Sequence, residues 1–167
     1  MSDLRKHMEM RREAFGPNLP NDFMLQYGRS YTIGPHTYLG PRDEPKACFK
    51  NATHLAIFDS RLTYVEGYMD MYGVPIQHAW LSDADGFVID PTIRNNDDNR
   101  ISEYFGVPFI TDYVEKACMA NGIYGILDYF YAGKTAPKLY ELGLEAGQQW
   151  LLDQKVRRRR ARKKEQV

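Results

Sequence analysis

The sequence predicts an α+β fold in which a cysteine-bearing helix packs on an antiparallel sheet. Apolar residues in 46–60 recur with helical spacing, which indicates an amphipathic helix. The segments 62–69, 76–82 and 87–90 follow, each rich in β-branched or aromatic residues and separated by turn residues. A helix followed by a three-stranded meander is typical of a mixed fold rather than of an all-helical or all-β one.

Composition favours one globular domain followed by a basic tail. The chain has 167 residues, of which 43% are hydrophobic and 26% are charged, and this suits a single core. Residues 1–154 are expected to form the domain. Residues 155–167 contain eight basic residues and one acidic residue. Because the formal net charge of the whole chain is zero, the domain itself is expected to be mildly acidic.

The cellular compartment and the absence of metal are also expected from composition. No apolar run approaches the about 20 residues of a membrane-spanning helix, and the chain starts with charged residues rather than a secretory signal. We therefore expect a cytoplasmic protein whose two cysteines, Cys48 and Cys118, are reduced. These cysteines and the four histidines show no zinc-type spacing, which predicts no metal site.

The N-terminal region is predicted to contain one helix and one strand. Residues 3–15 carry a weak apolar stripe at helical spacing, and the Gly/Pro-rich segment 16–21 ends that helix. Alternating apolar residues in 24–33 predict a strand, and a loop rich in Gly and Pro follows over 34–45.

The region after the meander is predicted to be largely helical. A polar loop at 95–99 precedes one helical turn at 101–106, and Thr111 or Asp112 is expected to cap a helix over 112–121. Pro137 is expected to open a last helix. Its buried face would comprise Leu139, Leu142, Ala146, Trp150 and Leu151.

Cys48, His78 and Asp90 are the candidate catalytic residues. A cysteine attacks as its thiolate, an imidazole accepts the thiol proton, and a carboxylate orients the imidazole. Cys48 falls in the first turn of the helix over 46–60, where the positive end of the helix dipole favours a thiolate. His78 and Asp90 lie in consecutive strands joined by a predicted hairpin, so the carboxylate is expected near the ring.

Each of these residues has a simpler interpretation when it is taken alone. Cys48 could be a small core residue, His78 a strand histidine with a satisfied partner, and Asp90 a turn residue before Pro91. Their order, and their placement on one helix and two adjacent strands, favour the catalytic interpretation when they are taken together.

Three further residues are candidates for supporting roles. Trp80 shares a strand face with His78 and is interpreted as a packing residue or as a wall of the site. The backbone N–H of Cys48 is the first expected donor to an oxyanion, and the side chains of Asn51 and Gln26 are candidates for the second donor.

The residues around these positions resemble a known family. Cys48 at a helix start, the run His78-Ala79-Trp80, and the run Asp90-Pro91-Thr92 after a glycine turn resemble the transglutaminase-like branch of the papain-like cysteine enzymes. The resemblance covers roughly residues 44–93. The chain departs from the family pattern at Lys46, where the family often has glycine, and at Phe49, where it often has tryptophan.

The resemblance implies a papain/transglutaminase-like core with additional C-terminal helices and no cofactor. It also implies acyl transfer through a thioester on Cys48, which includes peptide or isopeptide hydrolysis, deamidation and amide transfer to an amine. A protein or peptide substrate is expected on this basis.

The basic tail suggests two alternative functions from other classes. The chain could be an inactive adaptor of the same fold, or a protein that binds nucleic acid through its tail. Phosphates or an acidic partner would contact Arg157, Arg158, Arg159, Arg160, Arg162, Lys163 and Lys164. No groove-reading motif accompanies this run, and aromatic residues are not interleaved with it.

Overall fold

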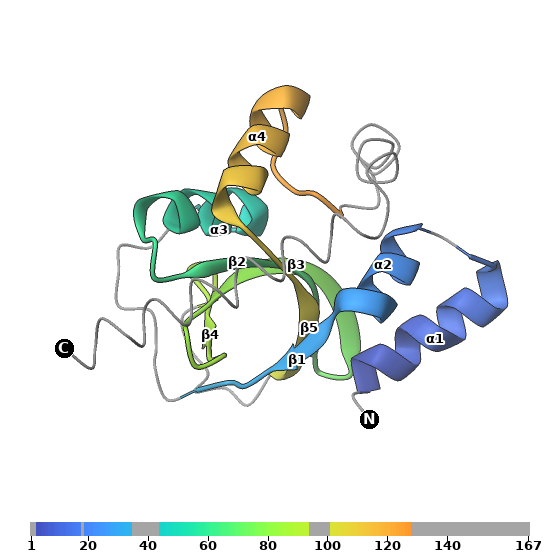
Figure 1. Cartoon of the computed structure of the whole chain (residues 1–167). Helices are drawn as coiled ribbons and strands as arrows, with labels where there is room; N and C mark the ends of the chain where they lie inside the picture. Colours follow the sequence, from blue (N-terminus) through green and yellow to red (C-terminus); the bar gives the residue numbers. More distant parts are fainter. Residues whose placement is uncertain (1–2, 18, 35–43, 94–100, 128–167) are drawn as a thin grey trace.

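The fold is α+β, as the sequence predicts. The computed structural model describes residues 3–17, 19–34, 44–93 and 101–127, and within them four helices and five strands are present. The strands form one curled antiparallel sheet, and the helices lie outside it (Figure 1). The predicted loop at 95–99, the predicted last helix from Pro137 and the basic tail lie outside the described residues.

The sheet has the order β1-β5-β2-β3-β4, and every neighbouring pair in it is antiparallel. The strands are β1 (Arg29–Tyr31), β2 (Thr63–Met71), β3 (Val74–Ser82), β4 (Val88–Ile89) and β5 (Ile101–Phe109). The predicted meander is therefore confirmed as β2, β3 and β4. The hairpin between β2 and β3 turns at Tyr72 and Gly73, which both have positive φ (55° and 78°), as a two-residue type I′ turn requires.

The prediction of a helical turn at 101–106 is wrong, because this segment belongs to β5. β5 lies between β1 and β2 and pairs with both of them. Hydrogen bonds to two distant segments therefore fix its extended backbone, and short-range sequence patterns do not report such pairings. Gly106 in its centre lies opposite Gly67 of β2, where the two backbones come close.

The prediction of a strand over 24–33 is correct only for its second half. Residues before Gly28 form helix α2 (Leu19–Tyr27), which buries Phe23 and Met24. The Gly28 N–H donates to the Met24 carbonyl at 2.7 Å and ends the helix. An apolar run this short fits a helix as well as a strand, so packing on the sheet decides between them.

The other helices that were predicted within the described residues are present. Helix α1 (Asp3–Phe15) has the predicted bounds, and α3 (Cys48–Phe58) begins at the candidate nucleophile. Helix α4 (Thr111–Asn121) is also present, but its predicted cap is wrong. The residue at the N-cap position is Ile110, and no side-chain hydrogen bond caps the helix. None of the helices in the described part of the chain combines the length and the apolar character of a membrane-spanning segment.

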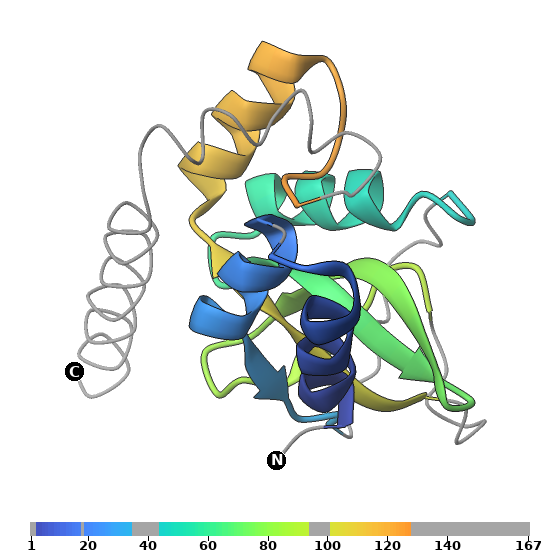
Figure 2. The same cartoon turned by 90° about the vertical axis from the view of Figure 1, so that its right-hand side faces the viewer.

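The curled sheet separates two apolar clusters. Backbone hydrogen bonds from Thr32 to Gly86 (3.3 Å) and from Val88 to Thr32 (2.9 Å) bring the chain after β1 against β4. The inner cluster comprises Tyr31, Val65, Met69, Trp80, Val88 and Tyr104. The outer face of the sheet packs against the helices, with α3 and α4 on one side and α1 and α2 on another (Figure 2). His78 precedes Trp80 by two residues in β3 and therefore shares its face of the sheet.

A pair of glycines makes room for the rings on the inner face. A Cβ atom on Gly106 would lie 2.6 Å from Cη2 of Trp80 and 2.7 Å from the Glu66 carbonyl oxygen. Gly67 lies opposite both Gly106 and His78 in the sheet. The backbone of β5 therefore passes directly against the indole ring that stacks on His78.

Replacing Gly106 by alanine is expected to lower the free energy of unfolding by about 1–3 kcal/mol, because a methyl group there overpacks a closed contact. Urea denaturation of the two proteins measures the difference. In a Trp80→Phe background, which lacks Cη2, the same substitution should cost less. An equal cost in both backgrounds would contradict the contact.

Candidate functional site

Three separate elements bring Cys48, His78 and Asp90 together. Cys48 is the first residue of α3, His78 lies in β3, and Asp90 follows β4 directly. His78 Nε2 and Asp90 Oδ2 are 2.7 Å apart, and the Cys48 side chain lies close enough to His78 to help raise its pKa. Because Nε2 is engaged by the carboxylate, Nδ1 is the ring nitrogen left for the sulfur. The predicted proximity of His78 and Asp90 is present in the structure.

Four donors hold the Asp90 carboxylate. Its Oδ1 accepts the backbone N–H groups of Thr92 (2.9 Å) and Ile93 (3.0 Å), and its Oδ2 also accepts the Tyr104 hydroxyl at 3.0 Å. Burial alone would raise the pKa of this 6% exposed group, but attraction to His78 and these hydrogen bonds lower it below its usual value. Asp90 is therefore an anion at neutral pH and fixes the orientation of the His78 ring.

His78 is buried, and its environment favours the imidazolium. Burial lowers the pKa of the ring, but the charge and hydrogen bond of Asp90, with further help from Cys48, outweigh it and raise the pKa to about 10. The ring also stacks on the indole of Trp80, with centroids 6.3 Å apart and planes inclined by 13°. At neutral pH the ring therefore carries a proton that it can give up to a leaving group.

The ion pair makes stability depend on pH in a defined direction. A histidine that titrates near 6.5 in the unfolded chain and about 10 in the fold contributes its full stabilisation below pH 6.5, and this is lost as pH rises towards 10. The lowered pKa of Asp90 acts at the acid end, where stability present above about pH 3.9 is lost on further acidification. The pair therefore stabilises the fold most between these two limits.

We expect the free energy of unfolding to fall between pH 6.5 and 10 by at most about 1.4 kcal/mol per pH unit from His78. Denaturant titrations over this range measure it. The His78→Gln variant should lose this component, whereas His54→Gln, at an exposed histidine, should keep it. The same alkaline slope in the wild type and in His78→Gln would contradict the pairing.

Tyr104 is a site residue that sequence reasoning missed. It lies in β5, in the segment predicted to be helical, and its 1% exposed ring contacts Trp80 at 5.0 Å between centroids. Burial and the charge of Asp90 raise the pKa of its hydroxyl far above the usual value, so it remains a donor to Asp90. A strand assignment for 101–109 would have placed Tyr104 in the sheet, and in the structure it lies opposite Met69 of β2.

Asn51 is not available as the predicted second oxyanion donor. Its amide nitrogen donates to the Glu44 carbonyl at 2.8 Å and to Thr92 Oγ1 at 3.1 Å, which uses both amide protons. The 3% exposed side chain instead ties the segment before Cys48 to the segment after Asp90. Asn51 is therefore a positioning residue that fixes the segment before Cys48 relative to the segment after Asp90.

Gln26 is also not placed as predicted. Its side chain is exposed on α2, and its amide donates to the hydroxyl of the neighbouring Tyr27 at 3.2 Å. α2 packs on α1 and β5, so the structure does not bring Gln26 into the candidate site. The expected side-chain donors are thus both occupied elsewhere.

The start of α3 offers backbone donors instead. The N-cap residue is Ala47, which makes no side-chain capping bond, and the first helical bond runs from the Asn51 N–H to the Ala47 carbonyl at 2.9 Å. Within the described part of the chain, the N–H groups of Cys48 and Phe49 have no acceptor. Two adjacent N–H groups beside the sulfur can stabilise a negative oxygen.

Trp80 is a packing residue rather than an exposed wall of the site. Its side chain is fully buried in the inner cluster and lies against His78, Tyr31 and Tyr104. It therefore supports the imidazole from inside the curled sheet.

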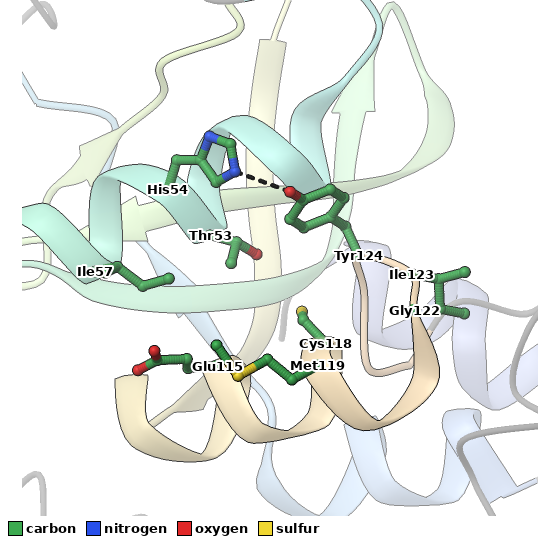
Figure 3. A pocket seen from close by; sticks show the side chains of 9 residues that line it. All are labelled: Thr53, His54, Ile57, Glu115, Cys118, Met119, Gly122, Ile123 and Tyr124. Carbon is green, nitrogen blue, oxygen red and sulfur yellow. Dashed lines mark hydrogen bonds between the residues drawn. The ribbon is translucent and has the colours of Figure 1, made fainter.

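A separate pocket of about 360 Å³ lies between α3 and α4 (Figure 3). It is lined by Thr53, His54, Ile57, Glu115, Cys118, Met119, Gly122, Ile123 and Tyr124. His54 Nε2 and the Tyr124 hydroxyl are 2.9 Å apart, so the His54 ring faces Tyr124. Burial raises the pKa of the Cys118 thiol, and the backbone of Gly125 and the Thr53 side chain oppose that rise only in part.

The described residues contain no group of three or more His, Cys, Asp or Glu side chains that could hold a metal ion. Comparisons of the chain with protein-family models, with curated proteins and with solved structures found no match.

Proposed function

We propose that this chain is a cysteine-dependent acyl-transfer enzyme with a papain/transglutaminase-like core. The single observation that carries the proposal is the series in which Cys48 lies beside His78 and His78 is hydrogen-bonded to Asp90. Cys48 is the first residue of α3. The His78 imidazole is buried and its raised pKa favours the protonated form, and the Asp90 carboxylate accepts hydrogen bonds from four donors. A core histidine needs one partner, whereas this series is the arrangement that an activated thiol requires.

The reaction would proceed in two halves. The Cys48 thiolate attacks a carbonyl carbon and forms a C–S bond, and the carbonyl π electrons move to oxygen. When the oxyanion collapses, the C–N bond breaks, and His78 gives its proton to the leaving amine. The resulting thioester is attacked by water or a second amine, whose proton returns to His78, and the thiolate leaves.

The remaining groups of the site would stabilise the negative charge of the oxyanion and fix the orientation of the His78 ring. The N–H groups of Cys48 and Phe49 would donate to the oxyanion, because both point from the uncapped start of α3. Asp90 would keep the His78 ring in one orientation, and Tyr104 would restrain the same carboxylate oxygen. Peptide or isopeptide hydrolysis, deamidation and amide transfer all use these steps and differ in the leaving group and the acceptor.

An activated ester such as p-nitrophenyl acetate tests the proposal directly. The full chain is expected to release p-nitrophenolate and to carry an acetyl group on Cys48, located by peptide mapping. Cys118→Ala should behave like the wild type, and Cys48→Ala should lose the acetyl group and the release above background. Acetylation that is no greater at Cys48 than at Cys118 would contradict an activated thiol.

A second candidate function is nucleic acid binding by the basic tail, residues 155–167, and it is favoured by the concentration of positive charge there. Removing residues 155–167 deletes a formal charge of +7 and is expected to abolish salt-sensitive binding to a nucleic acid duplex. Titration of the two chains with a fluorescent duplex measures the loss. Acetylation of Cys48 should be unchanged, because the tail supplies none of the residues of the candidate site. Equal duplex binding by both chains would exclude the tail as the contact.

A further inference from the structure

The segment directly before Cys48 is a tight turn with an unusual residue in it. The Ala47 N–H donates to the Glu44 carbonyl at 3.3 Å, which closes a four-residue β-turn. Pro45 occupies its second position, and Lys46 occupies its third position with φ of 64°. A turn with proline second and a positive φ third favours glycine or asparagine at the third position, because a side chain is strained there.

Several bonds hold this strained turn in place. The Glu44 carbonyl also accepts the Asn51 side-chain amide at 2.8 Å, and the Glu44 carboxylate pairs with Lys50 at 2.7 Å. Asn51 in turn reaches Thr92 beside Asp90. The turn is thus connected through Asn51 to the segment that follows Asp90. Backbone strain persists only where its surroundings enforce it, and it gathers at functional sites.

The Lys46 side chain is exposed and makes no ion pair with any residue that the structure describes. Two peptide units separate it from Cys48, so the two Cα atoms are at most about 7.6 Å apart. Lys50, on the first turn of α3, is by contrast engaged with Glu44. A charged side chain therefore occupies a strained backbone position two residues before Cys48.

We propose that Lys46 determines substrate specificity by attracting a carboxylate close to the reacting carbonyl of the acyl donor. This inference rests on the proposed function of Cys48. Glycine would relieve the strain of the turn, so we attribute the lysine to the positive charge that it places close in sequence to Cys48. The substrate class is therefore an anionic acyl donor, such as an acyl group that carries a carboxylate beside the scissile bond.

Iodoacetate and iodoacetamide form a matched pair of probes for this inference. In both reactions the thiolate forms a C–S bond and iodide leaves with the electrons of the C–I bond. The reagents differ in the charge of one group, and both need the same thiolate. The ratio of their second-order rate constants at Cys48 therefore reports attraction of the anion and not the amount of thiolate.

The ratio of iodoacetate to iodoacetamide rates at Cys48 is expected to fall about two- to fivefold in Lys46→Gln and in Lys46→Gly, the range for one exposed charge. Lys46→Arg should keep the ratio, and added salt should lower it in the wild type. Lys116→Gln on α4 removes the same charge from another exposed position and should leave the ratio unchanged.

An unchanged ratio in Lys46→Gln, while Cys48 still reacts faster than Cys118, would overturn the role of Lys46 and leave the proposed function standing. If Cys48 reacts no faster than Cys118 with either reagent, both the proposed function and this inference fail. Lys46→Gly serves as the second variant because glycine suits the turn, so the protein is expected to fold with it.

Discussion

Replacing His78 by alanine is expected to lower the rate of acyl transfer to Cys48 by about a thousandfold, within the range that general acid–base catalysis contributes. The ring lies beside the Cys48 side chain, and as an imidazolium it would keep the sulfur as the thiolate that attacks the ester. Initial rates of p-nitrophenolate release from the wild type and the variant measure the loss. The size of this effect follows from removing the proton carrier itself rather than a residue that positions it.

His54→Ala is the matched control for this substitution. His54 lies on α3, six residues after Cys48, and faces Tyr124 in the pocket between α3 and α4 (Figure 3). Its removal should leave acyl transfer unchanged. Because His78 is buried, His78→Gln is a second variant that keeps more of the volume, and circular dichroism should verify the fold of each. Full activity in a folded His78 variant would contradict the mechanism.

Replacing Asp90 by alanine is expected to lower the free energy of unfolding by about 3–5 kcal/mol, the range observed when one partner of a buried ion pair is removed. The substitution leaves the His78 imidazolium buried without its counter-charge. It also removes the acceptor of the Thr92 and Ile93 N–H groups and of the Tyr104 hydroxyl. Equilibrium urea denaturation near neutral pH measures the change.

Asp85→Ala provides the comparison, because Asp85 is an exposed carboxylate in the neighbouring hairpin. Its cost should stay within about 0.5 kcal/mol. In a His78→Ala background the cost of Asp90→Ala should shrink, because no buried cation remains to be left unpaired. A cost for Asp90→Ala similar to that of Asp85→Ala would show that the carboxylate is not part of a buried pair.

The parts of the fold that sequence reasoning predicted correctly are those set by short-range patterns. The helical spacing after residue 46 predicts α3 with Cys48 in its first turn, and the turn residues between apolar runs predict the meander. Because hairpins pair neighbouring segments, these patterns also predict that His78 and Asp90 lie close together. The location of the candidate site was thus predictable.

The parts that were missed depend on contacts between distant segments. β5 is extended because it pairs with β1 and β2 on its two sides, and Tyr104 reaches Asp90 only as a consequence. The link from Asn51 to Thr92 joins residues 41 positions apart, so no local spacing reveals that the amide of Asn51 is already used. The same holds for Lys46, whose positive φ is imposed by bonds to its turn rather than by its own preference.

Iodoacetamide labelling of the two cysteines, followed by peptide mapping, tests the central claim most directly. Near pH 6 an ordinary thiol is almost wholly protonated, and burial of Cys118 raises its pKa further. The protonated His78 beside Cys48 should make Cys48 react at least about tenfold faster than Cys118, and His78→Gln should remove the difference. Equally slow labelling of both cysteines in the folded wild type would contradict an activated nucleophile at Cys48.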